Sequence, residues 1–69
     1  MENITLIING ESRSIAAVSN VLELIQHLGI LESQIAVELN TKIIPRGDWE
    51  KTPVSNSDRV EIVQFVGGG

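Results

Sequence analysis

The chain has 69 residues and contains no cysteine, no tyrosine and only two residues of the Phe, Trp and Tyr class, Trp49 and Phe65. Without cysteine, no disulfide stabilises the fold and no side-chain thiol is available for sulfur chemistry or zinc binding. With so few aromatic residues, Ile, Leu and Val must supply most of the core. A chain this short forms one domain and leaves little room for an enclosed active site with a substrate pocket.

Positive charge is also scarce, since five Lys and Arg residues face nine Asp and Glu residues, giving a formal charge of −4. Phosphate backbones would repel such a chain, so we expect no nucleic-acid partner. The acidic excess favours steering toward a basic protein surface, or simply keeps a small domain soluble. No stretch is long enough to cross a membrane and no basic-then-apolar leader is visible. We therefore expect a cytoplasmic protein with no membrane partner.

The first half of the chain predicts a β-hairpin followed by a helix. Strands over 3–9 and 12–18 flank Asn9-Gly10, the dipeptide typical of a type I′ turn. Asn20 is the expected N-cap of a helix over 20–28, with Glu23 placed as in a capping box. The apolar stripe of this helix consists of Val21, Leu24, Ile25 and Leu28. Gly29 is the expected stop signal.

The second half predicts three more strands, over 35–39, 42–44 and 59–66. A loop or single turn over 47–51 holds Trp49, and a turn spans 55–58. The order β-β-α-β-β-β predicts an α+β domain with the β-grasp architecture, a mixed sheet of four to five strands packed on one main helix. We expect the first and last strands side by side at the centre, residues 1–66 as a single domain, and 67–69 as a flexible C-terminal tail.

The sequence ends in Gly67-Gly68-Gly69, and this tail is the leading functional candidate. Glycine has no Cβ, so such a tail fits channels too narrow for any other residue, and three extended residues reach roughly 10 Å. A free α-carboxylate on Gly69 suits a protein whose own terminus is the substrate of another enzyme. The alternative is a frayed or engineered end.

Other candidates have ordinary explanations. His27 lies on the solvent side of the helix with no second ligand, so a surface role is favoured over metal binding. Trp49 is expected to cover a core edge with its indole N–H near water. Arg46 is expected to be a surface arginine, with partner contact the lesser option. Val63 and Phe65 point off the helix-covered face, and we favour a docking surface there over scattered apolar residues.

Three segments resemble the ThiS family of ubiquitin-like sulfur carriers: Ala36-Val37-Glu38-Leu39-Asn40, then Ile44-Pro45-Arg46 with Trp49 three residues on, and the run from Asp58 to Gly69. The family often has glycine before the aspartate, where this chain has Ser57. The resemblance covers nearly the whole chain and implies a β-grasp fold.

The resemblance also implies a chemistry. A ThiF-like adenylyltransferase would use ATP and magnesium to adenylate Gly69. A persulfide sulfur donor would convert the adenylate to a thiocarboxylate, and a ThiG-like thiazole synthase would take the sulfur for thiamine. The chain would be a co-substrate, not an enzyme, and would bind no metal or cofactor itself. Gly67, Gly68, Val63 and Phe65 are the expected partner-binding residues.

Three other functions stay open at this point. A MoaD-like small subunit of molybdopterin synthase shares the fold and glycine ending, but typically has a longer chain and a proline-containing approach to the glycines. Here the approach is Gln64-Phe65-Val66. A ubiquitin-like protein modifier would use the same activated terminus. A plain interaction module would have an inert tail.

Overall fold

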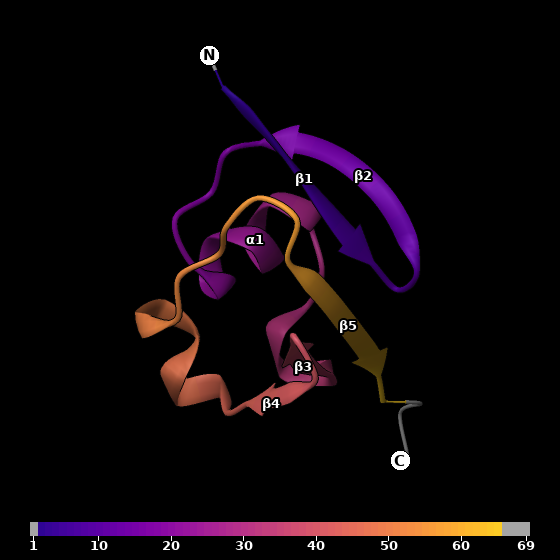
Figure 1. Ribbon diagram of the computed structural model, residues 1–69. Helices are drawn as coiled ribbons and strands as arrows, with labels where there is room; N and C mark the ends of the chain where they lie inside the picture. The colour runs from indigo at the N-terminus through magenta and orange to yellow at the C-terminus, as the bar shows by residue number, and fades with distance from the viewer. Residues whose placement is uncertain (1, 66–69) are drawn as a thin grey trace.

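The computed structural model describes residues 2–65. Its five strands form one sheet in the order β2-β1-β5-β3-β4, and a single main helix covers one face (Figure 1). The elements are β1 (Asn3–Ile8), β2 (Glu11–Ala16), α1 (Val21–Leu28), β3 (Ile35–Leu39), β4 (Lys42–Ile44) and β5 (Arg59–Gln64), with short 3₁₀ helices η1 (Glu32–Gln34) and η2 (Arg46–Lys51). The predicted mixed sheet is therefore confirmed. No helix within residues 2–65 has the length and apolar character needed to span a bilayer.

The β1–β2 hairpin forms as its turn residues predict. Asn9 has φ 50° and Gly10 has φ 83°, the positive values that a type I′ turn requires. Strand β2 ends at Ala16, two residues before the predicted end, although the Ala17 N–H still donates to the Glu2 carbonyl at 3.2 Å. Hydrogen bonding between the two strands of the hairpin therefore continues one residue beyond the end of β2.

Strands β1 and β5 run parallel at the centre of the sheet, as predicted, but only two residue pairs lie in register between them. The Asn9 side chain extends this seam. Its Oδ1 accepts from the Ile62 N–H at 2.7 Å, and its Nδ2 donates to the Ile62 carbonyl at 3.3 Å. A residue selected for the hairpin turn therefore also ties the hairpin to the last strand.

Helix α1 begins and ends where its capping residues predict. Asn20 Oδ1 accepts from the Glu23 N–H at 2.8 Å, while the Glu23 carboxylate accepts from the Ser19 N–H at 2.8 Å, one residue earlier than in a standard capping box. Gly29 closes the helix at φ 71°. The buried side chains of α1 belong to Val21, Leu24 and Ile25. They pack on the sheet, which stabilises a helix too short to form alone.

The core is aliphatic except for one tryptophan. Its buried members are Leu6, Ile8, Ile15, Val21, Leu24, Ile25, Ile35, Val37, Leu39, Trp49, Val54 and Val60. Trp49 is only 1% exposed. Its indole N–H donates to the Ile44 carbonyl at 2.9 Å, so the predicted place at a wet core edge is wrong. Trp49 is the buried residue of η2, and this short helix packs against α1.

Two polar residues of the ThiS-like segments hold a turn together. Asp58 Oδ1 accepts from Asn40 Nδ2 at 3.1 Å, and Asp58 Oδ2 accepts from the Ser55 N–H at 2.8 Å. Asn40 Oδ1 in turn accepts from the Arg59 N–H at 3.0 Å. The predicted turn role of Asp58 is confirmed. Ser57, beside it, has φ 75°, a backbone conformation that explains why glycine suits this position.

Candidate functional site

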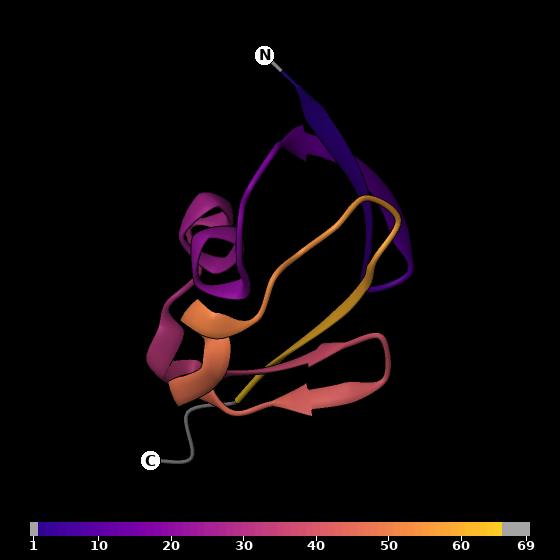
Figure 2. The same cartoon turned by 60° about the vertical axis from the view of Figure 1, so that its left-hand side comes forward.

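The candidate site begins where the described chain leaves the sheet. Strand β5 lies between β1 and β3, and the Phe65 N–H donates to the Gln34 carbonyl at 2.7 Å just beyond its end. The backbone is therefore held through Phe65, and the chain leaves the domain next to η1 (Figure 2). Val66 and the predicted tail, Gly67, Gly68 and Gly69, lie outside the described residues. Their predicted roles stay predictions.

The uncovered face of the sheet carries apolar side chains beside this exit. Val63 is 58% exposed and Phe65 is 56% exposed, so their predicted orientation is confirmed. Ile7, on the neighbouring strand β1, is half-buried. Ile43 on β4 is 72% exposed and was missed. The alternation of side chains along a strand could have predicted this exposure. Ile44 lies opposite buried Val37 and points toward the core, so Ile43 next to it must point outward. Ile43, Val63 and Phe65 are called the outer patch below.

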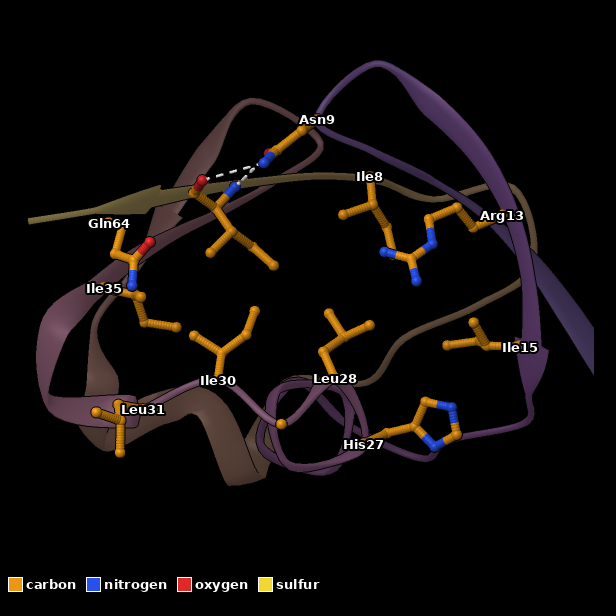
Figure 3. Close-up of a pocket in the computed structure, with 12 residues that line it drawn as sticks. Ile8, Asn9, Arg13, Ile15, His27, Leu28, Ile30, Leu31, Ile35 and Gln64 are labelled. Carbon is orange, nitrogen blue, oxygen red and sulfur yellow. Dashed lines mark hydrogen bonds between the residues drawn. The ribbon is translucent and has the colours of Figure 1, made fainter.

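On the helix-covered side, a hollow of about 530 Å³ opens between the end of α1 and the sheet. Seven of the twelve residues that line it are aliphatic: Ile8, Ile15, Leu28, Ile30, Leu31, Ile35 and Ile62. Figure 3 shows Arg13 pointing into this space, with His27 at the opposite rim. The lining includes no carboxylate, hydroxyl or thiol side chain. Its ionisable side chains are those of Arg13 and His27.

The remaining candidates lie on the surface, as predicted. His27 is exposed, and residues 2–65 contain no group of three or more His, Cys, Asp and Glu that could hold a metal ion. Arg46 Nη2 lies 3.5 Å from Glu32 Oε1, with the arginine side chain 59% exposed. Such an exposed ion pair links η1 to η2 but contributes at most about 1 kcal/mol.

The model of the ThiS family matches residues 6–69. The chain belongs to the ThiS family. The crystal structure of the thiamine biosynthesis protein ThiS from Geobacter metallireducens superposes with a TM-score of 0.81 at 32% identity, covering 96% of this chain and all of that one. This match confirms the predicted β-grasp architecture.

Two sequence relatives differ in length. The sulfur carrier protein ThiS of Escherichia coli is 28% identical over 64 residues, which cover 93% of this chain and 97% of that protein. The thiazole synthase of Paramagnetospirillum magneticum is 41% identical over 64 residues, but the chain spans only 20% of its length. Family membership supports the predicted place of this chain among the sulfur carriers of thiamine biosynthesis.

Proposed function

We propose that this ThiS-family protein carries sulfur as a thiocarboxylate on Gly69. The observation that carries the proposal is the arrangement at the exit. The central strand β5 is held through Phe65 by the Gln34 carbonyl, and three glycines follow one residue later. A rigid domain followed by a slim glycine end is suited to presenting a carboxylate to the active sites of successive partners.

The chemistry needs activation because a carboxylate is a poor electrophile. In the proposed sequence, a Gly69 carboxylate oxygen attacks the ATP α-phosphorus in a ThiF-like adenylyltransferase with magnesium, and pyrophosphate leaves. The terminal sulfur of a persulfide then attacks the acyl carbon and AMP leaves. A thiolate then attacks the donor sulfur of the resulting acyl disulfide, forming a new disulfide with the donor as the Gly69 thiocarboxylate leaves. Positioning by the partner lowers the barrier, by about 7–11 kcal/mol at most.

In this proposal the adenylyltransferase docks on the outer face of the sheet. Val63 and Phe65 are more than half exposed on or next to β5, the strand that leads into the tail. A partner that covers them also receives the tail, since both features share one strand. Exposed aromatic and aliphatic side chains next to a reactive terminus favour recognition over chance exposure.

The proposed acceptor of the sulfur is a ThiG-like thiazole synthase. The support is that a stretch resembling this chain occurs within a protein named thiazole synthase. One polypeptide that contains both parts favours a working association between them. This observation ranks the thiazole pathway above the molybdopterin pathway, for which a MoaD-like role is the second candidate on the shared fold and glycine ending.

Intact mass spectrometry tests the proposal directly. The protein is incubated with ATP, magnesium, a ThiF-type enzyme and a persulfide donor. We expect a mass gain equal to the replacement of one oxygen by sulfur, and no gain when Gly69 is amidated. A mass gain in the amidated protein would contradict the assignment to Gly69. No gain in the unmodified protein would favour a plain interaction module.

A genetic test separates the two pathways. The gene should relieve the thiamine requirement of a bacterium that lacks its own thiazole sulfur carrier, and should not restore molybdoenzymes in a strain lacking the molybdopterin carrier. Both synthases would accept a glycine thiocarboxylate, so docking residues outside the tail must discriminate. Rescue of the molybdenum pathway alone would reverse the ranking.

A further inference from the structure

Two glutamates face each other on the outer face of the sheet. In the antiparallel pairing of β3 with β5, Glu38 lies directly opposite Glu61. Their neighbours Val37, Leu39 and Val60 are buried on the helix side, so both carboxylates point to the other side. Residues directly opposite in such a pair have Cβ atoms about 4.5–5.5 Å apart, and like charges in this position destabilise the sheet.

No Lys or Arg side chain within residues 2–65 forms an ion pair closer than 4 Å with either glutamate. Within residues 2–65, the one ion pair closer than 4 Å joins Arg46 to Glu32, away from both glutamates. Arg59 lies on the outer face two positions before Glu61 but forms no such pair in this part of the chain. Lys42 pairs with buried Leu39 and is therefore directed to the opposite side. The two carboxylates therefore share one face of the sheet, and neither forms an ion pair within the described residues.

Apolar side chains flank the two carboxylates. Ile43 lies directly opposite Glu38 on β4, and Val63 follows Glu61 by two positions on β5. A partner covering the outer patch would exclude water around the carboxylates, and this strengthens their attraction for a cation. An arginine suits the place best, because its planar guanidinium has five donors and can bond to carboxylates on two sides at once.

We propose that Glu38 and Glu61 together bind an arginine side chain of the activating enzyme, with the outer patch packing around that contact. The inference rests on the proposed function, because it takes the adenylyltransferase as the occupant of this face. An arginine placed between the two carboxylates offsets the unfavourable pairing of like charges, so the contact contributes to binding and not to folding. The overall charge of −4 adds long-range attraction to a basic partner surface.

Steady-state kinetics of adenylation tests this contact. Glu38→Gln and Glu61→Gln keep the side-chain size and remove the charge. We expect each to raise KM for the carrier roughly tenfold at low salt, the loss typical of a charge-assisted contact, with kcat unchanged. The salt dependence of kcat/KM should also weaken. Thermal melting should show equal or higher stability, because the repulsion is gone. Glu11→Gln, an exposed glutamate on β2, is the matched control and should change neither KM nor Tm.

Each other outcome overturns the inference. An unchanged KM in both variants, with normal adenylation of the unmodified protein, would refute the arginine contact and leave the proposed function standing. A fall in Tm would show that the pair has a structural role. A dimer that dissociates in the Glu61→Gln variant, seen by size-exclusion chromatography, would assign the face to a second copy of the chain. No adenylation of the unmodified protein would remove the proposed function, and this inference with it.

Discussion

The two faces of the sheet are built from alternate residues of the same strands, but one face forms the core and the other is exposed. Strands β3 and β5 bury Val37, Leu39 and Val60 on the helix-covered face. On the other face the same strands and their extensions expose Glu61, Val63 and Phe65. Figure 2 shows that helix α1 covers the sheet from one side only. Because the domain has a single helical layer, its stability depends on one face and the other is free for partners.

The largest expected effect concerns the proposed reactive group, the Gly69 carboxylate, which belongs to neither of these two faces as defined by their residues. Removing Gly69, or amidating it, should abolish AMP transfer completely while leaving the melting curve unchanged, because glycine has no side chain to pack in a core. Adenylation would be followed by intact mass and folding by circular dichroism. Retained AMP transfer in either variant would disprove the role of Gly69.

The helix-covered face should respond to truncation with a large loss of stability. Leu24 is completely buried, so Leu24→Ala should lower the free energy of unfolding by about 2–5 kcal/mol, a large share of the total for so small a domain. Leu31, which is 65% exposed, provides the matched control. Leu31→Ala should change stability by no more than about 0.5 kcal/mol. Equal losses in urea denaturation would erase the distinction between a buried and an exposed leucine.

Substitutions on the outer face of the sheet should lower the affinity for a partner without lowering the stability of the fold. Phe65→Asp should weaken the complex with the adenylyltransferase at least about tenfold, because the change puts an unpaired charge into the interface. Its Tm should fall only slightly, since the side chain is already more than half exposed. Binding would be measured by calorimetry beside a melting curve. A large loss of stability with unchanged affinity would place Phe65 in the core.

The smallest expected effects are gains in stability from substitutions at two turns, which lie outside both faces of the sheet and have strained backbone. Thr41 and Ser57 both have φ 75°, which costs an L-residue about 1–2 kcal/mol. Thr41→Gly and Ser57→Gly should therefore stabilise the protein by about 0.5–1 kcal/mol after the loss of chain entropy is counted. Thr5→Gly, within strand β1, should instead destabilise it. Urea midpoints that fall in both turn variants would show that the side chains matter more than the backbone strain.

Local features of this protein were predictable from neighbouring residues. Asn9-Gly10 sets the hairpin turn, and Asn20 and Gly29 set the ends of α1, because each depends on backbone conformation and hydrogen bonds within a few residues. The alternation in β5 placed Val63 and Phe65 on the outer face for the same reason. The family motifs then connected the glycine ending to sulfur carriage.

Contacts between distant segments were decided only by the tertiary structure. The burial of Trp49 depends on how η2 packs against α1, and the hollow beside Arg13 depends on where the helix ends relative to the hairpin. Glu38 and Glu61 are 23 positions apart in the chain numbering, and only the β3–β5 register places them opposite each other. Sequence periodicity fixes which face a side chain takes. It does not fix which residue of another strand lies across from it, because that depends on the alignment of whole strands.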